Sequence, residues 1–453
     1  MGDFTTFLDG RVRLFAGDCR DGVAALADNS IDAVITDPPY ALESIRKRFG
    51  GPNAAKAQHG RDGAFARASA GFMGQKWDTG EVAFDPAFWA DVLRVLKPGG
   101  HVLAFSGTRT YHRLATAIED AGFEIRDMTA WLYGTGFPKN HDVAKGIDKK
   151  LGAARNVVGR ETITNDMRGG ATLNVAKDGK RESFERDITE AGSPEAAKWE
   201  GWGTALKPAM EPMCLARKPL DGTVAETVLK WGTGGLNIGA CRVDAPEGAV
   251  VKITHSETGS VRGYGGGIKG GIRSAPQTAG RYPANVLHDG SAEVIGAFPD
   301  APGQQRAVGP EHGAKASVYC YGDFGPRDHF EPRGDAGSAA RFFYSAKADG
   351  DDRVGSKHPT VKPVDLMRYF VRLVTPPGGL VLDPFAGTGT TGAAAFYEGF
   401  SAILCEREAD YQADIAVRMR LCLAGPEERK REISKRKNAD ETPLGGLFAG
   451  GEA

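Results

Sequence analysis

Short apolar runs and amphipathic stretches alternate along the first 140 residues of the chain. An apolar run of roughly four to eight residues predicts a buried strand, whereas apolar residues that recur every three or four positions predict a helix. Residues 86–98 are expected to form a helix that stops at Pro98-Gly99-Gly100. Strands that alternate with helices are typical of a parallel sheet covered by helices. The expected strands are residues 11–17, 31–36, 101–107 and 123–134.

The same alternation returns near the end of the chain. Residues 211–219, in the middle, are strand-like and could pair with the strand at 123–134. Later the pattern predicts, in order, a strand with a turn, a helix, a second strand and a second helix. These four elements are expected at residues 378–387, 391–400, 401–408 and 409–423.

Periodicity is weak in two long stretches, residues 141–204 and 236–335, which are rich in glycine, proline and charged residues. We expect them to be insertions into one core, or a second domain beside it. Residues 425–453 carry no helical apolar stripe after their charged run and are expected to form a mobile tail. The expected core consists of residues 1–140, 205–235 and 336–424.

Composition limits the class of protein. The 453 residues are 41% hydrophobic and 25% charged, as in globular proteins with a buried core. A net charge of −1 excludes a uniformly basic protein that coats nucleic acid, so any nucleic-acid site must be a local patch. The six cysteines are scattered without a Cys-x-x-Cys pair, which favours a reducing compartment. No apolar run approaches the roughly 18 residues of a membrane span, so we expect a soluble cytoplasmic protein without a signal peptide.

The strand at 31–36 ends at Asp37-Pro38-Pro39-Tyr40. Two consecutive prolines cannot continue a strand ladder or enter a helix interior, so the chain must leave the sheet here. One carboxylate and one aromatic ring are therefore held on a stiff loop at the carboxyl end of a buried strand. Taken alone, the tetrapeptide is also compatible with a simple strand-ending turn.

A second candidate site follows the strand that ends at Asp383. Gly387, Gly389 and Gly392 fit a G-x-G-x-x-G turn into a helix, which brings backbone N–H groups and a helix amino terminus against a negative group of a ligand. Glu406 lies seventeen residues after Gly389, at the expected end of the next strand, where an acid can accept hydrogen bonds from two ribose hydroxyls. The pattern predicts a site for a nucleoside with an attached anionic group.

Two other ligands fit the glycine turn less well. A phosphate-binding P-loop requires a lysine directly after the glycines, and none follows here. A nicotinamide site is a real alternative. In that fingerprint, however, the first glycine comes almost directly after the strand, whereas Asp383-Pro384-Phe385-Ala386 intervene here.

Together the two motifs resemble the amino-group DNA methyltransferases that use S-adenosylmethionine. In that family a D/N/S-P-P-Y/F/W tetrapeptide binds the target base, and a D-P-F-x-G-x-G-T-like loop binds the cofactor. Residues 37–40 and 383–390 match these motifs directly. The tetrapeptide comes first and the cofactor loop lies near the carboxyl end, which is the order of the beta class. Other segments, among them "GTGFPKNHD" and "GRYPANVLHDG", are similar to those of phage-type adenine-specific members.

The resemblance implies a fold and assigns a function to each segment of the chain. It implies an α/β protein with a circularly permuted, Rossmann-like methyltransferase fold and a mostly parallel sheet. Residues 1–140 would carry the target-base motif and residues 336–424 the cofactor motif, while the insertions 141–204 and 236–335 would recognise the target DNA.

The resemblance also assigns the site residues. The catalytic residues would be Asp37, Pro38, Pro39 and Tyr40. In this family an acid at the position of Asp18 meets the adenine of the cofactor, although an Asp after a strand is often only a helix cap. The S-adenosylmethionine contacts would be Asp18, Asp37, Thr360, Lys362, Pro363, Asp383, Pro384, Phe385, Ala386, Gly387, Gly389, Thr390, Thr391 and Glu406.

The chemistry of methyl transfer explains the tetrapeptide. The exocyclic nitrogen of adenine is a poor nucleophile because its lone pair is delocalised, and acceptors such as the Asp37 carboxylate and the Pro38 carbonyl localise that pair. A paired base must first be flipped out of the duplex at a cost of about a few kcal/mol. Stacking on Tyr40 offsets roughly 1–3 kcal/mol of that cost. The sulfonium methyl group is already a strong electrophile, so the enzyme mainly aligns the reactants and no metal is expected.

A basic segment follows the tetrapeptide. Residues 45–76 hold seven Lys and Arg residues against one acid, Asp62, and they include six glycines. A basic, glycine-rich loop beside the base pocket favours binding to the phosphates of double-stranded DNA, and the plainer interpretation is a solvated surface loop. The expected DNA contacts are Arg46, Lys47, Arg48, Arg61, Arg67 and Lys76.

The predicted reaction is therefore N6 methylation of adenine in DNA. The nearest alternative is N4 methylation of cytosine, whose enzymes more often carry serine in place of Asp37. A nicotinamide-dependent dehydrogenase would leave the tetrapeptide unexplained, and an inactive DNA-binding regulator would not need Asp37, Tyr40 and the glycine loop intact. A homodimer and a partner restriction nuclease are both compatible with the sequence.

Overall fold

The computed structural model describes residues 4–40, 82–134, 136, 140–164, 183–243, 280–301, 336–346, 349–356, 358 and 360–439. The chain divides into two compact units. The larger unit consists of Met1–Trp131, Glu211–Gly290 and Val294–Ala453, and the smaller unit consists of Leu132–Met210 and Ser291–Glu293.

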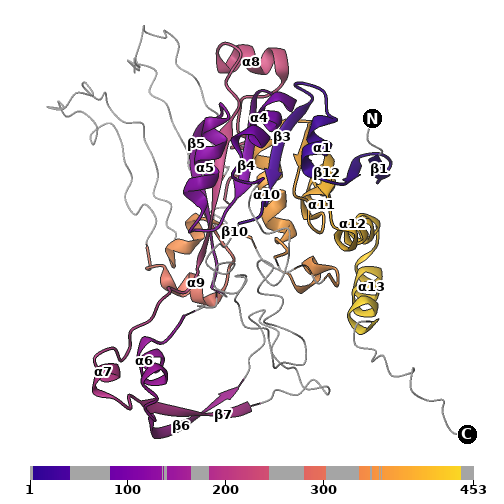
Figure 1. Ribbon diagram of the computed structural model, residues 1–453. Helices are drawn as coiled ribbons and strands as arrows, with labels where there is room; N and C mark the ends of the chain where they lie inside the picture. Colours follow the sequence, from indigo (N-terminus) through magenta and orange to yellow (C-terminus); the bar gives the residue numbers. More distant parts are fainter. Residues whose placement is uncertain are drawn as a thin grey trace, which may run out of the picture. The chain divides into compact units, whose positions relative to one another are not determined.

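A ten-stranded sheet forms the framework of the larger unit (Figure 1). Five neighbouring strands in its middle are parallel, whereas β1 and β8 run antiparallel to their neighbours β2 and β4. Across the sheet the order is β1 (Phe4–Phe7), β2 (Val12–Ala16), β12 (Ser401–Glu406), β11 (Leu380–Asp383), β3 (Ile31–Thr36), β4 (Leu96–Phe105), β8 (Met210–Arg217), β5 (Glu124–Leu132), β9 (Val286–His288) and β10 (Tyr344–Ser345).

The order of the strands interleaves the two ends of the chain. β12 pairs with β2 and β11 pairs with β3, so strands from the last quarter of the sequence lie between strands from the first forty residues. This arrangement confirms the predicted α/β fold with a mostly parallel sheet. The predicted pairing of the strand at 211–219 with the strand at 123–134 is also confirmed, because β8 and β5 are neighbours. Residues 286–288, within the expected insertion 236–335, contribute β9 to the same sheet.

Helices of the larger unit pack on both faces of the sheet, because successive side chains of a strand point in opposite directions. From β4, Val102 and Ala104 join a buried cluster with Trp89. The next side chain, Phe105, packs instead against Phe370 with 5.8 Å between ring centroids. The helices are α1 (Cys19–Ala24), α4 (Pro86–Val95), α5 (Tyr111–Asp120), α8 (Val224–Trp231), α9 (Ala292–Ala297), α10 (Val364–Val374), α11 (Thr390–Tyr397), α12 (Ala409–Leu421) and α13 (Pro426–Ala439), with 3-10 turns η4 (Ala339–Phe342) and η5 (Gly350–Arg353).

Helix α4 is shorter than the sequence pattern indicates. Asp85 caps its start by accepting a hydrogen bond from the Ala87 N–H (2.9 Å), and Pro86 occupies the first turn. The helix ends at Val95 because Leu96 is already extended, so β4 begins before Pro98 and the pairing with β3 is irregular there. The predicted helix over 86–98 is therefore wrong for its last turn.

The carboxyl-terminal segment corrects a second prediction. Residues 426–439, expected to belong to a mobile tail, form helix α13. Its side chain Ile433 is buried against Val354 and Leu421, and the guanidinium of Arg429 donates a hydrogen bond to the Leu421 carbonyl (2.9 Å). Residues 440–453 lie outside the described part of the chain.

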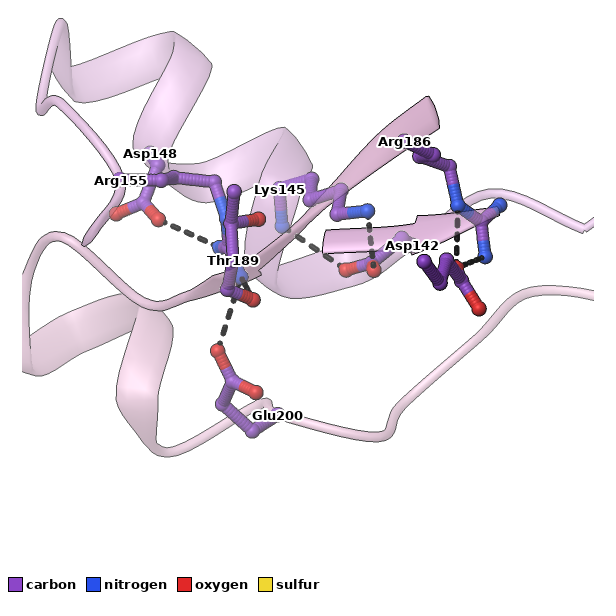
Figure 2. A network of polar contacts seen from close by, with 8 residues as sticks. Asp142, Lys145, Asp148, Arg155, Arg186, Thr189 and Glu200 are labelled. Atoms are coloured by element: carbon purple, nitrogen blue, oxygen red, sulfur yellow. Dashed lines mark hydrogen bonds and ion pairs between the residues drawn. The ribbon is translucent and has the colours of Figure 1, made fainter. Parts of the chain in front are cut away.

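The smaller unit contains a two-stranded antiparallel sheet, β6 (Asn156–Thr164) and β7 (Ser183–Glu190), with helices α6 (Val143–Leu151) and α7 (Pro194–Ala197). Figure 2 shows polar contacts of this unit, including those of Arg155. The Arg155 guanidinium contacts the carboxylates of Asp148 at 2.7 Å and Glu200 at 3.0 Å, and it donates to the Thr189 hydroxyl at 2.9 Å. Since Asp148 is only 1% exposed, this cation offsets the cost of burying its charge.

None of the helices in the described ranges is long and apolar enough to cross a membrane.

Candidate active site

The tetrapeptide lies at the carboxyl edge of the sheet, next to the strand that carries the glycine loop. All six residues of β3 are buried, and Asp37 follows directly after Thr36. The Thr36 hydroxyl donates to Asp383 Oδ1 at 2.6 Å, which joins the end of β3 to the end of β11. Carboxyl edges of parallel strands are where open α/β sheets bind ligands. The two motifs, nearly 350 residues apart in sequence, thus start from neighbouring strand ends.

Within the tetrapeptide, the Asp37 carboxylate and the Tyr40 phenol are hydrogen-bonded to each other. The Tyr40 hydroxyl donates to Asp37 Oδ1 at 2.7 Å, and the ammonium group of Lys362 lies 2.7 Å from Asp37 Oδ2. The same ammonium donates to the Tyr40 oxygen at 3.2 Å. Pro38 is buried between the two functional residues. The acid and the ring are therefore held in one fixed arrangement.

Glu211 is a member of this cluster that the sequence analysis missed. It stands near the start of β8, and its Oε2 lies 3.1 Å from the Lys362 ammonium. Burial raises the pKa of Glu211, although the neighbouring ammonium acts in the opposite direction. Burial lowers the pKa of Lys362, but Asp37 and Glu211 outweigh that effect and raise it overall, so the ammonium stays charged. The only sequence signal was an acid beside an apolar strand.

Asp383 is a buried side chain that stabilises the glycine loop through hydrogen bonds. Its side chain is 3% exposed and accepts hydrogen bonds from Thr36, from the Phe385 N–H (3.1 Å) and from the Thr391 hydroxyl. Burial raises the pKa of Asp383 to about 6. This carboxylate therefore ties the end of β11 to the first turn of α11.

Gly387 and Gly389 make the turn between β11 and α11 with φ angles of +53° and +77°, in the left-handed region that favours glycine. A Cβ at these positions would lie 3.2 Å from His358 Nε2 and 3.0 Å from an atom of Ile415. Both strain and lack of space thus require glycine here. The loop is a close-fitting backbone surface of the kind that accepts a nucleoside ligand.

Glu406 ends β12 and turns toward the loop. Its Oε2 accepts a hydrogen bond from the Gly387 N–H and its Oε1 accepts one from the Glu408 N–H, each at 2.8 Å. Burial raises the pKa of Glu406 to about 7. The carboxylate is therefore poised between its charged and neutral forms near physiological pH.

Asp18 stands beside Glu406 in the sheet and also caps a helix. β2 and β12 are paired with Ala16 opposite Glu406, and Asp18 follows two residues later. The Asp18 carboxylate accepts from the backbone and the guanidinium of Arg20, at 2.9 and 2.7 Å, and so caps α1. These bonds lower the pKa of Asp18 to about 2. The helix-cap interpretation is confirmed, and contact with the adenine of a cofactor remains a prediction.

The remaining predicted cofactor residues surround the same strand ends. The Thr360 N–H donates to His358 Nδ1 at 3.3 Å, and Pro363 is the residue before α10. Phe385 packs against the ring of Phe88, with 5.4 Å between centroids. Pro384, Ala386, Thr390 and Thr391 are buried in the loop and the first turn of α11. The predicted DNA contacts Arg46, Lys47, Arg48, Arg61, Arg67 and Lys76 lie outside the described residues.

Comparison with known proteins gives several matches by sequence. The family model described as DNA methylase matches residues 242–418. The type II methyltransferase M.HindIII of Haemophilus influenzae is 25% identical over 234 residues, which are 48% of this chain and 61% of that protein. The DNA adenine methyltransferase YhdJ of Escherichia coli is 35% identical over 83 residues, which are 18% of this chain and 28% of that protein. The chain thus spans about three fifths of M.HindIII and less of YhdJ.

Solved structures with low identity also match. The PvuII DNA methyltransferase (cytosine-N4-specific) is 13% identical with a TM-score of 0.39, and the match covers 96% of this chain and 97% of that one. The M1.HpyAVI–SAM complex is 12% identical with a TM-score of 0.36, covering 90% and 98%.

The sheet and its two motifs define an α/β protein in which two neighbouring motifs lie at the carboxyl edge of a mostly parallel sheet. Residues 242–418 are similar to the DNA methylase family, and the sequence relatives are named methyltransferases.

Proposed function

We propose that this protein transfers a methyl group from S-adenosylmethionine to the exocyclic N6 amino group of adenine in double-stranded DNA. The observation that carries the proposal is the fixed pair of Asp37 and Tyr40 at the end of β3, next to the strand that carries the glycine loop. A hydrogen-bond acceptor and an aromatic ring are what an extrahelical amino-bearing base requires.

The residues of the tetrapeptide have separate tasks toward the base. Asp37 and the Pro38 carbonyl accept hydrogen bonds from the amino hydrogens and thereby localise the lone pair of the nitrogen. Tyr40 stacks on the flipped base, a contact worth roughly 1–3 kcal/mol. Because the hydroxyl of Tyr40 is bonded to Asp37, the plane of the ring and the direction of the acceptor are set together.

The residues around the glycine loop fit the cofactor. Gly387 and Gly389 give the loop its left-handed turn, and the Glu406 carboxylate beside that loop can accept hydrogen bonds from ribose hydroxyls. Asp18, at the end of the neighbouring strand, would take the adenine amino group. S-adenosylmethionine supplies the activated methyl group when bound, and the protein binds it, orients it and excludes water.

Adenine is favoured over cytosine for two reasons. Position 37 is Asp, whereas enzymes that methylate cytosine N4 more often have Ser there. In addition, one of the similar proteins is named a DNA adenine methyltransferase, and 35% of the 83 aligned residues are identical. A dehydrogenase would leave Asp37 and Tyr40 without a task, and an inactive regulator would not need them.

DNA recognition is assigned to the remaining parts of the chain. The basic residues of segment 45–76 would bind phosphates, and the smaller unit together with segment 236–335 would recognise the target sequence. We place the protein in the cytoplasm, where it reaches DNA.

The test is incubation of unmethylated DNA with S-adenosylmethionine labelled in the methyl group, followed by digestion to nucleosides. We expect the label in N6-methyladenine. Label only in methylcytosine would contradict the choice of base, and an absence of label in any DNA would contradict the proposed activity. The variant Asp37→Ala serves as the inactive control.

A further inference from the structure

Lys362 is buried among the target-base residues, although the sequence resemblance assigned it to the cofactor. Its side chain is 7% exposed, and its ammonium lies within 3.2 Å of oxygens from Asp37, Glu211 and Tyr40. The ammonium also stands 5.4 Å from the centre of the Tyr40 ring and 4.9 Å from that of Phe105. We propose that Lys362 is a positioning residue for the base acceptor Asp37, and that Glu211 holds Lys362 in place. This inference rests on the proposed function.

The hydrogen-bonding capacity of the groups supports this role. The ammonium group of Lys362 donates a hydrogen bond to the Tyr40 oxygen and forms ion pairs with Asp37 and Glu211, so three oxygens on three segments restrict its position. Each oxygen of Asp37 already receives one hydrogen bond, from Tyr40 or from Lys362. A carboxylate oxygen can accept two such bonds. The carboxylate is therefore fixed in direction, and each oxygen keeps the capacity to accept an amino hydrogen.

The charges explain why a lysine is needed. Two carboxylates, Asp37 and Glu211, share one buried cation, and without it they would repel each other. Among the described residues, His358 and Asp383 also interact electrostatically with this site. Burial lowers the pKa of His358 to about 4, so it is neutral at physiological pH and cannot replace the ammonium. Lys362 is therefore the cation that holds Asp37 and Glu211 together in this cluster.

The experiment compares Lys362→Met with Lys362→Arg and Glu211→Gln. We measure turnover of labelled S-adenosylmethionine on DNA as a function of pH, and cofactor affinity by calorimetry. In Lys362→Met we expect turnover to fall about a hundredfold. The acid limb of its turnover profile should move up by about one pH unit or more, because the site has lost its cation. Cofactor affinity should change less than about threefold.

The two companion variants make the effect specific. Lys362→Arg keeps the charge, so its acid limb should stay at the wild-type pH even if the geometry of the larger cation lowers turnover. Glu211→Gln leaves the ammonium to Asp37 alone, so its acid limb should stay or move down. An upward move in Glu211→Gln as large as in Lys362→Met would contradict the proposal.

Lys362→Met leaves Glu211 buried without its cation, which destabilises the fold. The double variant Lys362→Met/Glu211→Gln removes that charge as well and is measured alongside, with thermal unfolding as the folding control. If the folded double variant loses cofactor affinity while its acid limb stays at the wild-type pH, Lys362 acts on the cofactor and the proposal is wrong. If the wild-type protein binds cofactor but methylates no DNA, the proposed function fails and the inference with it.

Discussion

At the scale of single residues, the two carboxylates of the strand ends β3 and β12 differ in what surrounds them. Asp37 faces an ammonium and a phenol, whereas Glu406 faces two backbone N–H groups, those of Gly387 in the glycine loop and of Glu408. We therefore expect Asp37→Ala to reduce methyl transfer below detection while cofactor affinity stays within about threefold of wild type. Calorimetry and the labelled transfer assay measure the two quantities. Equal losses in both would contradict the assignment of Asp37 to the base.

Glu406 gives a prediction about pH. Since burial raises its pKa to about 7, the carboxylate becomes neutral as the pH falls through that value. The charged form accepts hydrogen bonds from two ribose hydroxyls better than the neutral form. Cofactor affinity should therefore strengthen between pH 6 and pH 8 in the wild-type protein, as calorimetry at several pH values would show. In Glu406→Gln the affinity should be about tenfold weaker and nearly independent of pH over this range. A wild-type affinity that does not vary would contradict the prediction.

At the scale of elements, helix α13 is tied to the glycine loop through a chain of contacts. The Arg436 guanidinium contacts Asp414 on α12, Asp414 accepts from the Ser356 hydroxyl, and Ser356 accepts from the His358 N–H at 3.0 Å. The His358 ring is the group that a Cβ at Gly387 would approach at 3.2 Å. Helix α13 thus supports the residues that pack against the glycine loop.

The packing of this helix can be measured. Ile433→Ala should lower the free energy of unfolding by about 2 kcal/mol, because Ile433 is 3% exposed between Val354 and Leu421. The neighbouring exposed Ser434 offers a matched control, and Ser434→Ala should change the free energy by less than about 0.5 kcal/mol. Denaturant unfolding provides both values. Indistinguishable curves for the two variants would show that α13 is not packed in solution.

The sequence predicted the elements whose pattern is local. The sequence predicted the strand at 31–36, both motifs, and the strands and helices after residue 378. It did so because in each of them an apolar run is followed directly by turn residues. Helix α13 was missed because its main buried apolar residue, Ile433, stands in a highly charged segment and forms no stripe. Glu211 was missed because its role depends on β8 lying beside β4, a pairing between distant segments.

At the scale of the whole molecule, the sheet explains why the two motifs can stand at opposite ends of the sequence. β2 and β3 from the beginning flank β12 and β11 from the end, so the strand ends that carry Asp18, Glu406, Asp383 and Asp37 follow one another across the sheet. Neither end of the chain can complete this edge alone. The two motifs, expected at opposite ends of the sequence from the resemblance to the beta class, therefore lie on neighbouring strands.

Apart from the short segment 291–293, the smaller unit is one continuous stretch of chain, Leu132–Met210, inserted into the larger unit. The Tyr133 N–H donates to the Ala209 carbonyl at 3.0 Å, so the chain leaves and returns at adjacent points, just beyond β5 and β8. A short turn can join such neighbouring ends at little cost in loop entropy.

We expect a variant with residues 134–208 replaced by an Asn-Gly turn to fold and to bind S-adenosylmethionine within about threefold of wild type. If the smaller unit recognises DNA as proposed, the same variant should lose site-specific methylation. Calorimetry and sequencing of methylated positions test the two halves of the prediction, and loss of cofactor binding in a folded variant would show that the smaller unit is required by the cofactor site.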